Sequence, residues 1–77
     1  MIKLKLKFKD IESTKEFVKI TEKQPFDVDI SSGRQVVDAK SILGVLSIDL
    51  GRGHLLLVNA ENEECKTFLE EIKEYIV

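Results

Sequence analysis

The side chains that could do chemistry in this sequence are few and scattered. There is one histidine, His54, and one cysteine, Cys65, and no group of residues has the spacing of metal ligands. The chain contains neither a Gly-x-Gly-x-x-Gly motif nor a phosphate-binding loop with its lysine. The segment Gly51-Arg52-Gly53 is too short to cradle a phosphate and is interpreted as a helix stop and a turn. We therefore expect no enzyme activity, no bound metal and no cofactor.

Both reactive side chains have an ordinary structural interpretation. A histidine can carry a phosphoryl group or act as a base. No carboxylate flanks His54 to orient it, so we predict an exposed histidine at the start of a strand. Cys65 falls on an apolar stripe, one helical turn before Phe68 and Leu69. It is predicted to be a small core residue and not a nucleophile.

Charged residues are distributed unevenly along the chain, whose net charge is −2. Residues 1–23 contain seven lysines and four acids, whereas residues 59–77 contain six glutamates and two lysines. A nucleic-acid binder usually gathers basic residues on one face of a basic domain, so no nucleic-acid partner is expected. A polyanion site formed by Lys3, Lys5 and Lys7 is the alternative to a simple solvated face.

Length and composition predict one small domain, residues 1–77, whose thin core suits a sheet covered by helices. No apolar run approaches the roughly 20 residues that span a bilayer. The segment Met1–Lys5 lacks the apolar stretch of a secretory signal. A single cysteine cannot form an internal disulfide, which fits a reducing compartment. These features predict a cytoplasmic protein with no membrane partner.

Alternating apolar and polar residues predict four strands to position these side chains. The strands cover residues 2–8, 26–30, 34–39 and 54–59, with Ser31-Ser32-Gly33 as the turn of a hairpin. Three aspartates fall on these strands with an outward orientation: Asp27, Asp29 and Asp38. They are expected to be solubilising charges unless folding brings them together.

Three helices are predicted by apolar residues at spacings of three and four. The first covers about 14–23 and begins at a Ser13–Glu16 capping box. The second runs to about residue 50 with Ser41 as its N-cap, and the third extends over residues 65–76 with Asn62 as its cap. The order is strand, helix, strand, strand, helix, strand, helix, which predicts an α+β fold.

One segment is more specific than the rest. Residues 37–47 read Val-Asp-Ala-Lys-Ser-Ile-Leu-Gly-Val-Leu-Ser. This run resembles the regulatory-serine region of HPr, the histidine-containing phosphocarrier protein of the bacterial sugar phosphotransferase system. Looser similarity at Phe17-Val18 and at 61–72 extends the resemblance over residues 11–76. It implies an open-faced β-sandwich, with a four-stranded antiparallel sheet covered on one face by three helices.

The first site of the HPr family is a histidine at the start of the first helix, in a Gly-Leu-His-Ala-Arg-Pro motif. It accepts phosphate from enzyme I and passes it to sugar-transport subunits. Aligning back from Phe17 puts Asp10 at the histidine and Glu12 at the arginine. A phosphate on Asp10 would need cationic support, which Glu12 opposes. The resemblance thus implies a degenerate phosphocarrier site, in which Asp10 either mimics a phosphohistidine or is a remnant.

The second site of the family is a serine at the start of the second helix, present here as Ser41. In many Gram-positive members an ATP-dependent kinase phosphorylates this serine, and the product docks onto a transcriptional regulator. Phosphate on Ser41 would meet free backbone N–H groups and the positive end of the helix; the alternative is an N-cap alone. Three residues match family positions in an exposed apolar docking patch, for which full burial is the alternative: Ile42, Leu43 and Leu46.

The leading hypothesis is an HPr-like regulatory or protein-docking module, without histidine phosphocarrier activity and with control by serine phosphorylation. It would be similar to the catabolite-repression proteins that keep the serine but lack the histidine. One alternative is a true phosphocarrier of the phosphoenolpyruvate-dependent sugar phosphotransferase system, with His54 or Asp10 as acceptor. Another is a non-enzymatic scaffold or homodimer formed through an open sheet edge. Expected partners are other proteins, among them a serine kinase and a transcriptional regulator, with the chain a monomer or homodimer.

Overall fold

The alternating segments form one antiparallel sheet in the computed structural model, which describes all residues 1–77. Its strands are β1 (Ile2–Leu6), β2 (Val28–Ser32), β3 (Gln35–Asp38) and β4 (His54–Val58). They lie in the order β1-β4-β2-β3, and each neighbouring pair is antiparallel. The β2–β3 hairpin turns at Gly33, whose φ of 63° suits a residue without a β-carbon.

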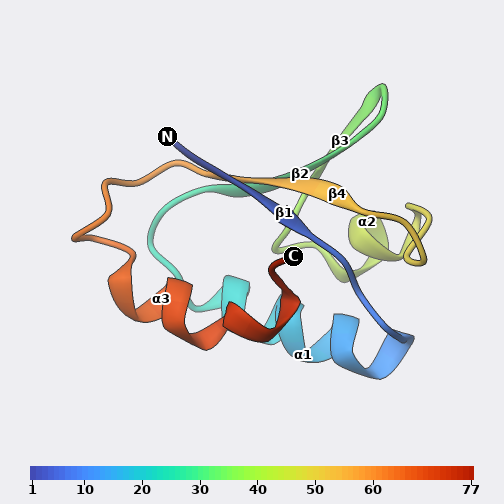
Figure 1. Cartoon of the computed structure of the whole chain (residues 1–77), viewed down its shortest axis with the longest axis horizontal. Helices are drawn as coiled ribbons and strands as arrows, with labels where there is room; N and C mark the ends of the chain where they lie inside the picture. The colour runs from blue at the N-terminus through green and yellow to red at the C-terminus, as the bar shows by residue number, and fades with distance from the viewer.

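Helices cover only one face of this sheet (Figure 1). Helices α1 (Ile11–Glu22) and α3 (Lys66–Glu71) lie side by side beneath it, and a 3-10 turn, Lys73–Tyr75, follows α3. The short helix α2 (Ile42–Leu46) packs against α1 and β3. None of the helices has the length and apolar character needed to cross a bilayer. The predicted fold class and order of elements are confirmed.

The core lies between the sheet and the helices. Alternate strand residues such as Leu6, Ile30 and Leu56 point into it and are fully buried. Aromatic rings fill its centre: Phe17 meets Phe8 at a centroid distance of 5.1 Å and Tyr75 at 5.2 Å, both edge to face. This cluster joins the segment after β1, helix α1 and the C-terminal turn, and therefore holds α1 in place.

Helix α1 begins earlier than predicted because Asp10, and not Ser13, is its N-cap. The Asp10 Oδ1 atom accepts a hydrogen bond from the Ser13 backbone N–H at 2.7 Å, and aspartate is among the strongest N-cap residues. The hydroxyls of Ser13 and Thr14 donate to the Asp10 carbonyl oxygen at 3.1 and 2.8 Å. Both residues lie inside the first turn, so the predicted Ser13–Glu16 capping box is wrong.

The other two helices are shorter than predicted. Helix α2 ends at Leu46, where the Ser47 hydroxyl donates to the Gly44 carbonyl oxygen at 2.6 Å and the chain passes into turns. Helix α3 begins only at Lys66 and has no side-chain cap, so the predicted Asn62 cap is wrong. A local hydrogen bond competes there, because the Glu64 carboxylate accepts from the Glu61 backbone N–H at 3.1 Å.

The C-terminal residues cover part of the β1 edge. The Lys7 backbone N–H donates to the Tyr75 carbonyl oxygen, and that of Val77 donates to Lys5, both at 3.0 Å. Leu6 and Ile76 form a single antiparallel bridge between these two bonds. Residues 75–77 therefore extend the sheet beside the second half of β1 and leave its first residues at the free edge.

Candidate functional site

Ser41 occupies the N-cap of α2, as predicted. Its backbone is extended, with φ −103° and ψ 112°, and its Oγ accepts a hydrogen bond from the Gly44 backbone N–H at 3.3 Å. The Ser41 backbone N–H donates to the Asp38 carbonyl oxygen at 3.0 Å, which ties the cap to the end of β3. Ser41 is exposed, so its hydroxyl combines accessibility with a position at a helix N-terminus.

The Lys40 ammonium points away from this hydroxyl toward the end of α1. Its Nζ donates to the Gln24 carbonyl oxygen at 2.8 Å, while the Lys40 backbone N–H donates to Asp38 Oδ1 at 2.9 Å. The positive charge of Lys40 is therefore anchored at the C-terminal end of α1. With the Lys40 ammonium bound there, the hydrogen-bond donors nearest in sequence to the Ser41 side chain are the backbone N–H groups of α2.

The apolar residues of α2 are exposed to different degrees. Leu43 has 80% of its surface exposed, which is unusual for a large hydrophobic residue in so small a protein. Ile42 and Leu46 are half-buried and Val45 is fully buried, because a short amphipathic helix turns one side to the core. Leu43 thus forms the exposed centre of the patch, with Ile42 and Leu46 at its margins.

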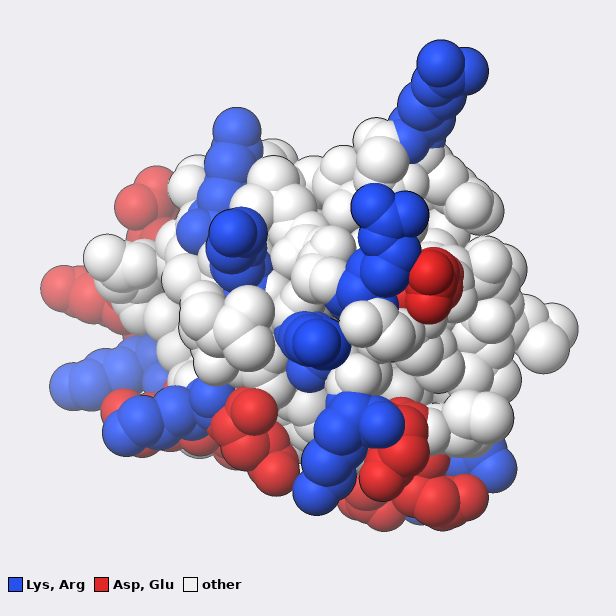
Figure 2. Space-filling view, turned by 45° about the vertical axis from the view of Figure 1, so that its right-hand side comes forward, with Lys and Arg blue, Asp and Glu red and all other residues white.

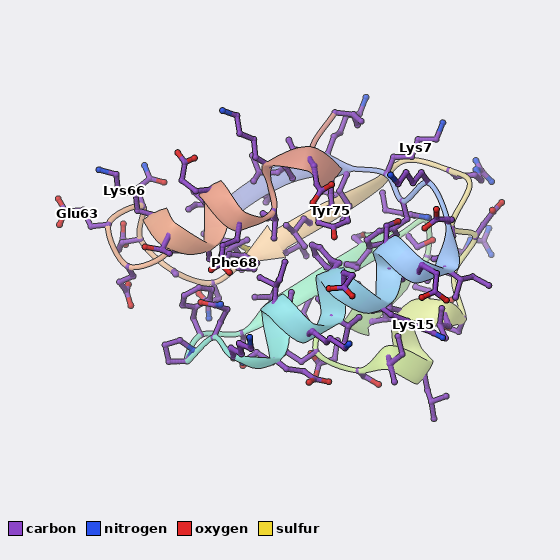
Figure 3. All side chains as sticks on the ribbon, turned by 90° about the horizontal axis from the view of Figure 1, so that it is seen from below. Lys7, Lys15, Glu63, Lys66, Phe68 and Tyr75 are labelled. Carbon is purple, nitrogen blue, oxygen red and sulfur yellow. The ribbon has the colours of Figure 1, made fainter.

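A shallow groove with lysines on one side adjoins this patch. It has a volume of about 290 Å³ and lies between α1 and α2, with Ile42 on one wall and α1 residues on the other: Lys15, Val18, Lys19 and Glu22. Figure 3 shows Lys15 on the side of α1 that faces α2. Sequence reasoning missed the two lysines, although their spacing of four places them on one face of a helix.

Asp10 serves the N-terminus of α1 and takes no part in the apolar patch on α2. Hydrogen bonds from Ser13, first from its backbone N–H and then from its side chain, hold the pKa of the Asp10 carboxyl below its ordinary value. Glu12 is exposed and pairs with Lys15, at 3.7 Å between Oε1 and Nζ. The two acids of the degenerate site are thus engaged separately, one in a cap and one in an ion pair.

This cap predicts a specific dependence of stability on pH. Because the folded pKa of Asp10 lies below its ordinary value of 3.8, the stabilisation is complete above 3.8 and is lost as the pH falls through the folded pKa. Asp10→Asn keeps the cap without the charge. We expect its urea midpoint to fall less steeply with acid than that of the unmodified chain. Parallel curves for the two proteins would contradict the prediction.

His54 is buried, with 7% of its surface exposed, so the prediction of an exposed histidine is wrong. It pairs with Leu6 in the sheet, and period two places it on the same inward face as Leu56 and Val58. Its Nε2 lies 2.6 Å from the Asp49 carbonyl oxygen. The alternation of residues in β4 was visible in the sequence and indicates that His54 is buried. It deserved more weight than the glycine turn that precedes His54.

The other candidate residues, Cys65 and the strand aspartates, lie in the core or on the sheet. Cys65 is buried as predicted, with 1% exposure, and burial raises the pKa of its thiol. Asp29 and Asp38 are brought together, because they are direct partners across β2 and β3. Partial burial, followed by the charges of Asp38 and Asp27, raises the pKa of Asp29.

Comparison with known proteins identifies the family. Residues 12–77 match the family model described as PTS HPr component phosphorylation site. The chain belongs to the HPr family. The matched part contains Ser41 and the apolar residues of α2, whereas Asp10 lies before it. The resemblance seen in residues 37–47 is thereby confirmed.

Two solved structures have the HPr-like fold of this chain. HPr-C-His from Thermoanaerobacter tengcongensis is 23% identical, with a TM-score of 0.73, over 96% of this chain and 92% of that one. Crh, a catabolite repression protein of Bacillus subtilis that forms an intertwined dimer with a swapped domain, is 22% identical. Its TM-score is 0.63, over 100% of this chain and 92% of Crh. A search of curated proteins gives no match.

Proposed function

We propose that this chain is an HPr-like regulatory or protein-docking module without histidine phosphocarrier activity, controlled by phosphorylation of Ser41. Residues 1–77 would then form one HPr-like domain that acts in the cytoplasm without catalytic activity or a cofactor. The observation that carries it is that Ser41 and Leu43 are both exposed and lie two residues apart at the start of α2, with 80% of the Leu43 surface exposed. A modification site and an apolar contact surface therefore adjoin one another.

Phosphorylation would change this surface in two ways. A phosphate carries about −1.5 to −2 charges near neutral pH. At the N-cap it would meet free N–H groups and the positive end of α2, a stabilisation of roughly 0.3–1 kcal/mol. Since the Lys40 ammonium is bound to the Gln24 carbonyl, the rest of the charge would face outward. The partner is accordingly expected to present a cation beside an apolar pocket for Leu43.

The degenerate site supports the absence of phosphocarrier activity. The Asp10 carboxylate accepts the Ser13 N–H through Oδ1, and a phosphoryl group on Asp10 would need cationic support, which Glu12 opposes. His54 is buried and its Nε2 lies against the Asp49 carbonyl oxygen. Asp10 thus acts as a helix cap, and His54 is not exposed to a partner protein. Incubation with phosphoenolpyruvate and enzyme I is therefore expected to leave the mass of the chain unchanged.

The test of the proposal is the intact mass after incubation with ATP and the serine kinase that acts on this family. We expect a gain of one phosphate that disappears in Ser41→Asn, because asparagine keeps the N-cap but has no hydroxyl to modify. Ser47→Ala is the matched control, since Ser47 is an exposed serine at the other end of α2. It is expected to accept phosphate normally.

Two results would contradict the proposal. One is no gain in mass while the kinase modifies a control substrate, which would leave Ser41 as a helix cap. The other is a gain that persists in Ser41→Asn, which would place the modification elsewhere. Circular dichroism checks that Ser41→Asn is folded. If the folded variant is not phosphorylated, it has lost only the hydroxyl that accepts the phosphate.

A further inference from the structure

One face of the sheet carries no helix (Figure 1). The side chains on this face have an ordered charge pattern. Alternation along the strands turns one set of side chains outward on this face. Across the order β1-β4-β2-β3, one row reads Lys3, Leu57, Asp29, Asp38. The adjacent row reads Lys5, Leu55, Ser31, Val36. We call the whole surface the open face.

The open face thus consists of three strips. Lysines lie along β1, half-buried leucines along β4, and the two aspartates across β2 and β3. Strands are spaced about 4.8 Å apart, so side chains on β1 and β2 start roughly 10 Å apart. No ion pair joins the two strips, because the one ion pair in the molecule joins Lys15 to Glu12 on α1. Figure 2 shows basic side chains standing apart from one another over the upper part of the surface it displays.

Neither charged strip therefore has an ion-pair partner within one molecule. The Asp38 carboxylate accepts a hydrogen bond from the Lys40 backbone N–H. Asp29 and Asp38 face one another directly across β2 and β3, and like charges in that position destabilise a sheet. The raised pKa of Asp29, due to partial burial and then to its acidic neighbours, is consistent with that repulsion. A partner that brings positive charge to β2 and β3 and negative charge to β1 would relieve both strips at once.

We propose that the open face binds a second copy of this chain, with Lys3 of each copy over Asp38 of the other. A twofold axis parallel to the strands reverses the strand order across the interface. It sets β1 of one copy over β3 of its partner and keeps each row facing the same row. The leucines of β4 then lie near the centre, between sheets about 10 Å apart.

Other occupants fit this surface less well. A polyanion attracted by Lys3 and Lys5 would be repelled by Asp29 and Asp38, which lie in the same row as Lys3. Strand addition at the β1 edge is restricted, because residues 75–77 already pair with its second half. Four strands of about five residues give a face of only about 300 Å² in flat projection, against about 800 Å² per partner in a standard interface. The dimer is therefore expected to be weak and sensitive to salt.

The experiment is sedimentation velocity of the full chain over micromolar to millimolar concentrations, at low and high salt. We expect a concentration-dependent dimer that weakens as salt is added. The double variants Lys3→Glu with Lys5→Glu, and Asp29→Lys with Asp38→Lys, are each expected to weaken self-association at least tenfold. Mixing the two variants is expected to restore dimers, because every lysine strip then faces an acidic strip.

Two control variants separate the open face from the helical face as the site of self-association. Lys15→Glu with Lys19→Glu makes the same charge change on α1 and is expected to leave the dimer unaltered. If a double variant does not fold, the mixing experiment is repeated with the single variants Lys3→Glu and Asp38→Lys, each of which changes one exposed residue. A chain that stays monomeric at all concentrations would overturn the proposal. A dimer that persists in both charge-reversal variants would also overturn it. The same holds if the chain does not self-associate but binds heparin, and the lysine reversal abolishes that binding.

Discussion

Replacing Phe17 by alanine is expected to lower the free energy of unfolding by about 3–5 kcal/mol. Phe17 is fully buried, and its ring lies between those of Phe8 and Tyr75 at 5.1 and 5.2 Å. Truncation removes apolar burial, leaves a cavity and also breaks two edge-to-face contacts. A domain of 77 residues has a total stability of about 4–12 kcal/mol. The loss would therefore be at least about a quarter of the total stability.

Urea denaturation followed by circular dichroism checks this prediction. The matched control is Ile11→Ala on the same helix, because Ile11 is 54% exposed and contributes little to the core. It is expected to change stability by about 0.5 kcal/mol or less. Similar losses for the two variants would show that the aromatic cluster is not the part of the core that holds α1.

Replacing Thr21 by valine is expected to cost about 1–3 kcal/mol, although the side chain keeps its shape. The buried Thr21 hydroxyl lies 2.6 Å from the Ala39 carbonyl oxygen and 2.9 Å from that of Val18. Ala39 has no exposed surface and precedes Ser41 by two residues. Valine would leave the buried Ala39 carbonyl without this donor and would loosen the segment that leads into α2.

Hydrogen exchange together with urea denaturation measures both consequences. The Ser41 amide, bonded to the Asp38 carbonyl oxygen, is expected to exchange faster in Thr21→Val. Thr67→Val is the matched control, because Thr67 is exposed on α3. It is expected to stay within about 0.5 kcal/mol of the unmodified chain. Unchanged stability in Thr21→Val would mean that the hydroxyl does not tie α1 to the Ser41 segment.

The order of elements was predictable because it depends on local patterns. Alternation in Ile2–Leu6 and the sequence around Ser41 each specify a strand or a cap within a few residues. The burial of Cys65 followed from helical spacing in the same way. Helix ends were predicted less well. At Asp10 and Ser13 two good capping residues compete, and the helix begins at the earlier one.

By itself, therefore, the sequence determined the α+β fold, the HPr resemblance and the N-cap position of Ser41, all of which depend on neighbours in the chain. Only the tertiary structure decided what depends on distant neighbours. It bound the Lys40 ammonium to the Gln24 carbonyl. It also aligned Lys3 with Asp38 across four strands, because register between strands places side chains that no local pattern relates.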